Sequence, residues 1–236
     1  MKNSLNILMI THDRLEYLKK AVEGVQRQTF NDWKLIIWDN ASGPKTRKWL
    51  SGLRDERITV YFNPTNDSLA SVTTSIFVAS RTQFVGKVDP DTIVPPDWAE
   101  RLIHAHELHH FGFIGGFHFR PEDLNDISPN IENYNGVRIW RKHHIGGCAF
   151  IIRRKDFKGY AGIGVMGLSE YQERMGFVNG YLWDPILYVD HMEDARSEHY
   201  ISNDEYRKYK MKTRGLTLER YQSSIINHSY MKENTL

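Results

Sequence analysis

Cysteine is almost missing from this chain of 236 residues, which contains only Cys148. A single thiol cannot form a disulfide within the chain or supply a zinc cluster made of thiolates, so we expect a reducing, cytoplasmic setting. Long apolar runs are missing as well, because no stretch approaches the ~18 to 20 apolar residues that span a bilayer. The run at residues 5–10 is also too short for the core of a signal peptide. We therefore expect no transmembrane segment.

An excess of charge of either sign is also lacking. The 31 Lys and Arg residues and the 29 Asp and Glu residues leave a formal net charge of +2, so the composition does not predict a nucleic-acid partner. Hydrophobic residues form 40% of the chain and aromatic residues 12%, which is typical of a globular protein and not of a disordered one. The length suffices to bury a sizeable core in one large domain.

Short apolar runs alternate with helix-like patterns in the first half of the chain. The runs predict strands, and apolar residues that recur every three or four positions predict helices. Asp13 can cap the first helix, and Pro44 can open the second. The alternation predicts an α/β fold in which helices flank a mostly parallel central sheet. The expected strands are 5–10, 34–38, 57–62 and 83–88, and the expected helices are 15–29, 44–53 and 69–79.

The second half is less periodic. Polar residues at 120–136 and glycines at 159–167 predict loops, and the charged residues from about 193 onward predict a helical tail. Because the chain has no internal repeat and no long linker, we expect a single domain over residues 1–236, with one half at about 1–110, a second at about 111–200 and a tail at about 201–236. The other expected elements are helices at 97–110 and near 169–175, and strands at 111–119, 137–141, 148–152 and 181–189.

Polar residues follow three of the predicted strands, as Thr11-His12-Asp13, Asp39-Asn40 and Asp89-Pro90-Asp91. A parallel α/β sheet binds its ligands beyond the carboxyl ends of the strands, so these are the candidate site residues. Two carboxylates one residue apart can hold a hard divalent cation against a diphosphate. The structural alternative is an ordinary turn that Asp89-Pro90 opens and Asp91 caps.

Several ordered blocks of the sequence resemble the family 2 glycosyltransferases of the GT-A fold, which is related to the Rossmann fold. Residues 6–18 are similar to the family's opening, residues 28–42 to its second-strand block, and Asp89-Pro90-Asp91 to its Asp-x-Asp motif. Residues 94–98 are similar to the stretch after that motif, and residues 146–154 to a later glycine pair, apolar strand and arginine pair. The blocks keep the family's order over roughly residues 5–191, which is more specific than any single motif.

The resemblance implies transfer of a sugar, with inversion, from a nucleotide-diphosphate sugar to an acceptor hydroxyl. A UDP-sugar is the expected donor, and the acceptor stays open between a glycan, a lipid-linked glycan and a protein. The first half of the chain would bind the donor and the second half the acceptor. By position in the family's pattern, the nucleoside pocket would contain Thr11, His12 and Asp39.

The metal and phosphate contacts are likewise carried over by position. Asp91 would bind the metal directly, His191 would be a further metal ligand, and Asp89 would reach the ribose or a metal-bound water. Lys87 could touch a phosphate, although a lysine at a strand end is more often solvated. The implied cofactor is Mn²⁺ or Mg²⁺, and an imidazole ligand favours Mn²⁺.

The expected catalytic base is Glu170, in the stretch where the family usually has an acidic pair at the start of a helix. Ser169 replaces the first acid of that pair, so Glu173 is kept as a reserve candidate. A structural alternative is that Ser169 caps a helix and Glu170 is an ordinary first-turn residue. Because Ser169 replaces an acid, a second function also remains an alternative: a non-catalytic protein with the same fold that binds a nucleotide sugar or a glycan.

Two rival motifs are present. His106-Glu107-Leu108-His109-His110 satisfies the zinc-peptidase pattern, but no third ligand follows at a recognisable spacing, so we favour a solvated helix face. Residues 162–167 satisfy the dinucleotide pattern, with Asp184 as the possible ribose ligand of an NAD-linked enzyme. That motif should follow a strand directly, and here it does not, so an acceptor-side loop is the better interpretation.

Overall fold

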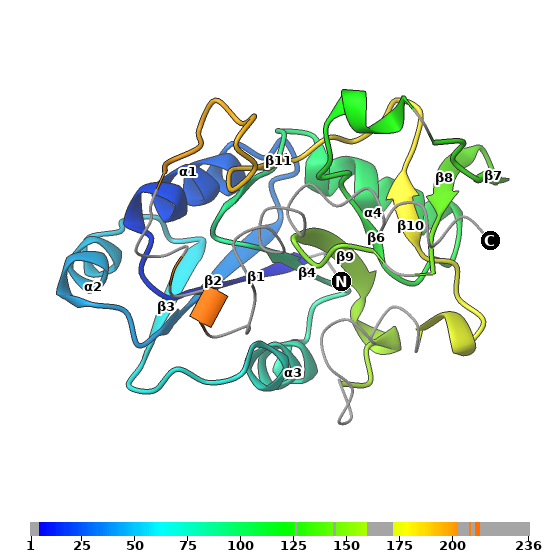
Figure 1. Cartoon of the computed structure of the whole chain (residues 1–236). Helices are drawn as coiled ribbons and strands as arrows, with labels where there is room; N and C mark the ends of the chain where they lie inside the picture. Colours follow the sequence, from blue (N-terminus) through cyan, green and yellow to red (C-terminus); the bar gives the residue numbers. More distant parts are fainter. Residues whose placement is uncertain are drawn as a thin grey trace.

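The computed structural model describes residues 5–125, 127–143, 145–159 and 172–202, together with 208, 211 and 212 (Figure 1). Its first part contains β1 (Leu5–Thr11), α1 (Leu15–Gln26), β2 (Trp33–Asn40), α2 (Pro44–Ser51), β3 (Ile58–Asn63), α3 (Leu69–Ala79), β4 (Phe84–Val88), β5 (Thr92–Ile93) and α4 (Trp98–Leu108). The remainder contains β6 (Ile114–Gly115), η1 (Pro121–Leu124), β7 (Ile131–Tyr134), β8 (Val137–Arg141), β9 (Ala149–Arg153), η2 (Arg154–Asp156), β10 (Gly180–Leu182) and β11 (Asp190–His191).

Nine of these strands form one sheet in the order β3-β2-β1-β4-β9-β6-β10-β8-β7, and β5 and β11 form a separate ribbon. The four strands β1 to β4 are mutually parallel. β9 is antiparallel to β4 and β6, β10 runs parallel to β6, and β8 is antiparallel to β10 and β7. Within this sheet all strands except β8 and β9 therefore point the same way, which confirms the predicted α/β fold.

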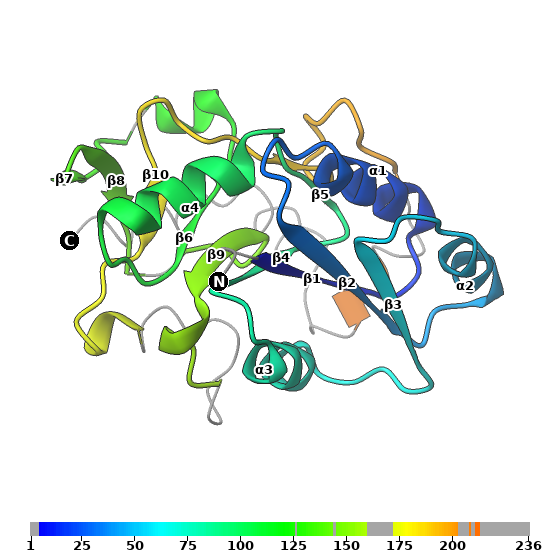
Figure 2. The same cartoon turned by 180° about the vertical axis from the view of Figure 1, so that it is seen from behind.

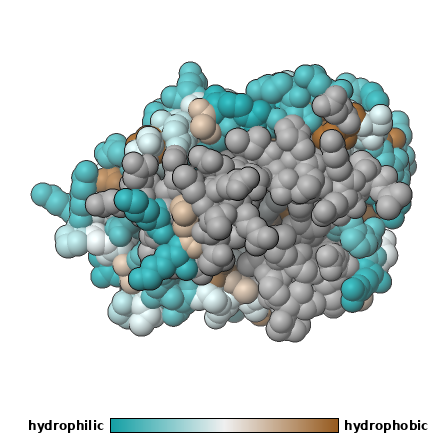
Figure 3. Space-filling view, viewed as in Figure 1, coloured by the Kyte–Doolittle hydropathy of each residue, from teal (hydrophilic) through white to brown (hydrophobic). Residues whose placement is uncertain are grey.

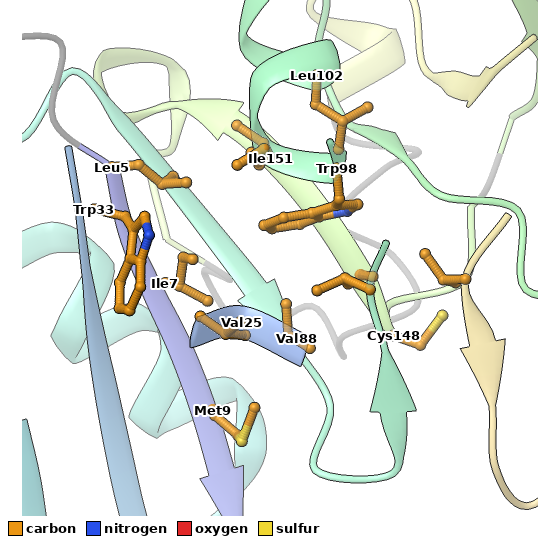
Figure 4. Close-up of a cluster of buried hydrophobic side chains, with 14 of the residues drawn as sticks. Leu5, Ile7, Met9, Val25, Trp33, Val88, Trp98, Leu102, Cys148 and Ile151 are labelled. Carbon is orange, nitrogen blue, oxygen red and sulfur yellow. The ribbon is translucent and has the colours of Figure 1, made fainter. Parts of the chain in front are cut away.

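Helices cover both faces of the sheet, with α1 and α4 on one face and α3 on the other (Figures 1 and 2). Ile7 of β1 belongs to the buried cluster that includes Val25 of α1 and Trp98 of α4 (Figure 4). Its neighbour Leu8 belongs to a second buried cluster, with Phe77 of α3. A strand covered on both faces needs apolar side chains at successive positions, which explains the unbroken apolar run of β1.

The elements expected in the first half are all found, and α3 has the predicted bounds. In the second half, the strand expected at 111–119 is wrong and shrinks to β6. The chain leaves β9 at Gly116, and the Phe117 amide donates instead to the Leu187 carbonyl (2.7 Å). The loop expected at 120–136 contains η1 and β7. The strand expected at 181–189 ends at Leu182, before Pro185, which has no amide proton to extend a ladder.

The segment after β11 is also different from the expectation. Residues 192–202 contain turns and bends and no helix, so the helical tail does not begin near 193. Of residues 203–236 the structure describes only 208, 211 and 212, and these three are helical. Of the helix expected near 169–175, residues 172–174 are helical and 169–171 lie outside the described residues. On the face shown in Figure 3, hydrophilic residues predominate along the upper edge, where these turns and η1 lie in Figure 1. In the described part of the chain, no helix has the length and apolar character needed to cross a membrane.

Candidate metal centre

Three potential metal ligands, Asp91, His191 and Glu193, come together although a hundred residues separate the first from the others. The β5–β11 ribbon causes this, because its register places His191 opposite Thr92, and the Met192 amide donates to the Asp91 carbonyl (2.9 Å). One ligand atom from each of the three side chains lies within 4.8 Å of the other two. Asp91 and Glu193 are each only 8% exposed.

The chemistry of this cluster fits a divalent cation. Two carboxylates and one imidazole suit Mn²⁺, and the carboxylates also suit Mg²⁺. The structure thus places the predicted ligands Asp91 and His191 together and adds Glu193, which the sequence analysis missed. A signal existed, since Glu193 is an acid two positions after His191, but its meaning depends on the pairing of β11 with β5.

Arg14 is a second residue that the sequence analysis missed. Its guanidinium bridges the two carboxylates, with Nη1 2.6 Å from Asp91 Oδ2 and Nη2 2.8 Å from Glu193 Oε1. The arginine side chain is only 10% exposed, and its guanidinium carbon lies 4.5 Å from the ring centre of Tyr17. Two neighbouring buried carboxylates repel each other, and the Arg14 cation between them offsets this repulsion.

An uncommon backbone turn brings Arg14 to this position. Asp13 and Arg14 both have φ of 59°, in the left-handed region that residues other than glycine rarely adopt. The Asp13 amide donates to Ser42 Oγ (2.8 Å), and Asp13 Oδ1 accepts from the Gly43 amide (2.8 Å) and from Thr46 Oγ1 (3.3 Å). The expectation that Asp13 caps the first helix is therefore wrong, because its carboxylate lies at the start of α2.

The predicted nucleoside residues lie at the adjoining ends of β1 and β2, where Thr11 pairs with Asp39. Thr11 and Asp39 are fully buried, whereas His12 is exposed, with Nδ1 2.8 Å from the Asn40 carbonyl. The Asp39 carboxylate accepts from the Ser42 amide (3.1 Å) and from Arg47 Nε (2.7 Å). In this structure Asp39 therefore braces the loop after β2, and His12 is the member of this group that faces solvent.

Lys87 and Asp89 connect the end of β4 to the glycine pair that precedes β9. The buried Lys87 ammonium donates to the Asp89 carboxylate and to the Gly147 carbonyl (3.1 Å), and the Asp89 amide donates to the Cys148 carbonyl (2.7 Å). Burial raises the pKa of Asp89, the Lys87 charge opposes this rise, and the Asp91 carboxylate adds to it. The Lys87 ammonium thus contacts protein groups in this structure.

The glycine pair also shapes the surroundings of His191. A Cβ atom at Gly146 would overlap the ring of His118. That ring lies nearly perpendicular to the His191 ring, with centroids 6.3 Å apart. Glycine at 146 therefore allows the His118 ring to lie beside the ring of His191, the candidate imidazole ligand.

The predicted base, Glu170, lies outside the described residues. The carboxylate of the reserve candidate Glu173 contacts Nδ1 of His143 and lies 3.6 Å from an Arg141 nitrogen. Arg141 belongs to β8, which β9, β6 and β10 separate from β4, a lateral distance of about 19 Å at the usual strand spacing. The structure therefore brings Glu173 together with Arg141 and His143, and not with Asp91.

The rival zinc motif is not assembled. His106 is fully buried on α4, its Nε2 lies 3.1 Å from the Ile151 carbonyl, and burial lowers its pKa to about 3. His110 lies beyond the end of α4, with Nε2 2.6 Å from Asp156 Oδ2. The two histidines bind different partners, and the expectation of a solvated helix face is wrong for His106. The glycines at 162–167 lie outside the described residues, and Asp184 pairs with Arg138.

Comparison with known protein families distinguishes the glycosyltransferase interpretation from the zinc-peptidase and NAD-linked ones. The sequence model described as Glycosyl transferase family 2 matches residues 6–161. The chain belongs to this family. The colanic acid biosynthesis glycosyl transferase WcaA of Escherichia coli (strain K12) is 27% identical to the family 2 chain over 119 residues. That match covers 48% of this chain and 43% of WcaA, so it spans less than half the length of this relative.

Solved structures support the fold of the family 2 chain. The mannosyltransferase PcManGT from Pyrobaculum calidifontis, in complex with GDP-Man and Mn²⁺, has a TM-score of 0.65 at 14% identity, covering 96% of this chain and 68% of its own. S. aureus TarS 1–349 has a TM-score of 0.58 at 13% identity, with 95% and 70% covered. GalNAc-T7 with UDP, GalNAc and Mn²⁺ has a TM-score of 0.59 at 14% identity, with 94% and 50% covered. These similarities confirm the GT-A fold.

Proposed function

We propose that this chain is a metal-dependent glycosyltransferase that moves a sugar from a nucleotide-diphosphate donor to an acceptor hydroxyl. The observation that carries the proposal is the cluster of Asp91, His191 and Glu193, beside the loop after β1, from which Arg14 contacts two of them. Membership of glycosyl transferase family 2 supports it. Two of the similar structures contain Mn²⁺, one with GDP-Man and one with UDP and GalNAc.

The proposed role of each side chain follows from its position. Asp91, His191 and Glu193 would hold Mn²⁺ or Mg²⁺, which when bound would neutralise the charge that develops on the leaving diphosphate. His12 and the buried pair Thr11 and Asp39 would frame the nucleoside at the ends of β1 and β2. Lys87 would keep Asp89 oriented, because its ammonium binds both that carboxylate and the Gly147 carbonyl.

The finer features of the reaction belong to the same proposal. We propose a UDP-sugar as donor, inversion at the anomeric carbon, and Glu170 as the base that takes the acceptor proton. We also propose that both halves of the chain form one catalytic domain, because a single sheet runs through them. The acceptor would then approach from the side of β6 to β10.

Nucleotide binding with and without a metal tests the proposal. UDP and GDP are titrated calorimetrically into the protein in the presence of Mn²⁺ or of EDTA, with wild type, Asp91→Asn and Asp97→Asn compared. Asp97 is an exposed acid near the start of α4 that pairs with Arg101, so its variant controls for loss of one negative charge. We expect Mn²⁺-dependent binding in wild type and Asp97→Asn, and its loss in Asp91→Asn. Nucleotide binding of equal strength in EDTA and in Asp91→Asn would contradict the metal assignment.

Turnover separates an enzyme from a binding protein on the same fold. Nucleoside diphosphate release from UDP-sugars is measured in the presence of a panel of glycan, lipid-linked and peptide acceptors. We expect acceptor-dependent release by wild type, and Glu170→Gln should bind the donor normally but release none. If Glu170→Gln turns over at the wild-type rate, the base is another group, and if no acceptor stimulates release by wild type, the binding-protein alternative is favoured.

A further inference from the structure

We infer that Arg14 is a built-in counter-cation of the metal centre, which competes with the divalent ion for Asp91 and Glu193 and thereby weakens metal binding. The inference rests on the metal dependence proposed above. It concerns a residue of this chain that contacts two of the three candidate ligands.

The first support is the overlap between the arginine contacts and the candidate metal ligands. Arg14 binds one oxygen of each carboxylate, at 2.6 and 2.8 Å, through separate guanidinium nitrogens. The same two carboxylates are within reach of a common metal position with His191. A divalent ion bound by these carboxylates would be separated from the Arg14 guanidinium only by the carboxylate groups that both contact. Like charges so close repel strongly where water is largely excluded.

The second support is the low solvent exposure of the cluster. The side chains of Arg14, Asp91 and Glu193 are 10%, 11% and 8% exposed. Removing two carboxylates from water is costly without a cation. Arg14 supplies that cation whether or not a metal is bound, so it holds the two carboxylates close together at the expense of metal affinity.

The third support is that the chain is built to hold the guanidinium there. Two consecutive residues, Asp13 and Arg14, adopt the left-handed conformation, and Asp13 is fixed by Ser42 and Gly43 at the start of α2. On its other side Arg14 lies over Tyr17, whose hydroxyl accepts from the Ile201 amide (2.7 Å) and donates to the Ile201 carbonyl (3.2 Å). The guanidinium is therefore held between the metal ligands and the segment after β11.

The test is a direct measurement of Mn²⁺ binding, without nucleotide or turnover. The electron paramagnetic resonance signal of free Mn²⁺ gives the dissociation constant for wild type, Arg14→Gln, Arg14→Lys and the control Arg27→Gln. Arg27 is an exposed arginine just after α1 that pairs with Glu23. We expect Arg14→Gln to bind Mn²⁺ about tenfold more tightly or better, because a repelling charge is removed, whereas Arg14→Lys and Arg27→Gln stay close to wild type.

Thermal unfolding of the same proteins provides a second measurement in case Arg14→Gln is strongly destabilised. Without metal, Arg14→Gln should melt below wild type, and Mn²⁺ should raise its melting temperature by more than it raises that of wild type. Equal affinities in wild type and Arg14→Gln, or weaker binding by the variant, would overturn the competition while leaving the metal site intact. Absence of Mn²⁺ binding by both proteins, with UDP as well as without it, would overturn the metal proposal itself.

Discussion

The two ends of the sheet are stabilised in different ways. Strands β1 to β4 are five to eight residues long and run parallel. Strands β1, β2 and β4 bury side chains in the two clusters under the helices, whereas the edge strand β3 is only partly buried. Strands β6 and β10 are two and three residues long, and the space around them is filled by aromatic rings. The first end therefore relies on long backbone ladders, and the second relies on side-chain packing between segments distant in sequence.

Phe117 is the centre of that packing, and its truncation should have the largest effect. Its ring lies within 6.0 Å, centroid to centroid, of the rings of Phe119, Trp140, Tyr181, Trp183 and Tyr188. We expect Phe117→Ala to lower the free energy of unfolding by about 3 to 5 kcal/mol, as for other buried aromatic residues. Urea denaturation followed by circular dichroism measures this loss.

The matched control for Phe117 is Phe62→Ala. Phe62 lies on the edge strand β3 and is 44% exposed, so we expect a loss below about 1 kcal/mol. If the two variants were equally destabilised, the contrast between the two ends of the sheet would be wrong.

The same contrast explains how far the sequence could predict the fold. In the first half each element has its own signal, as in α3, where the Ser68 hydroxyl accepts from the Ser71 amide at the predicted start. In the second half the aromatic residues at 111–119 alternate as in a strand, but their partners are chosen by distant segments. The Phe117 amide leaves the sheet for Leu187, and a Cβ atom at Gly116 would overlap Val189. No local pattern contains this information.

In the candidate site, too, residues with a local sequence signal could be predicted, and residues placed by distant segments could not. Asp91 could be predicted from the Asp-x-Asp block and His191 from its position after the last expected strand, and the structure brings them together. Glu193 could not be predicted, because its position depends on the register of β11 with β5. Arg14 could not be predicted either, because it depends on a left-handed turn at residues other than glycine. The base Glu170 stays a prediction.

His106 lies where the two ends of the sheet meet, on α4 against β9, and should give the next largest effect. Burial lowers its pKa to about 3 in the folded protein, against ~6.5 in the unfolded chain. The unfolded state therefore binds the proton first as pH falls, and stability should decrease between about pH 6.5 and 3 by ~1.4 kcal/mol per pH unit. From pH 7 to pH 5 we expect this histidine to account for about 2 kcal/mol.

Replacement of the histidine tests that assignment. Unfolding free energies between pH 5 and 7.5 should depend less on pH in His106→Leu than in wild type. His104→Leu is the control, because His104 is 68% exposed on the same helix. A wild-type pH dependence in His106→Leu would show that other groups cause the loss of stability in acid.

The smallest expected losses of unfolding free energy come from removing helix caps, one local in sequence and one distant. Ser68 caps α3 through a bond to Ser71, three residues away, and Ser68→Ala should cost about 1 kcal/mol of unfolding free energy. Asp13 lies at the start of α2 but comes from the loop after β1, thirty residues earlier. Asp13→Ala should cost about 1 to 2 kcal/mol and should also weaken the placement of Arg14, so that Mn²⁺ affinity changes in this variant and not in Ser68→Ala. A change in stability alone, with Mn²⁺ affinity unaltered, would mean that the left-handed turn keeps its shape without the Asp13 carboxylate, and that the backbone between β1 and α1 is sufficient to direct Arg14 to its ligands.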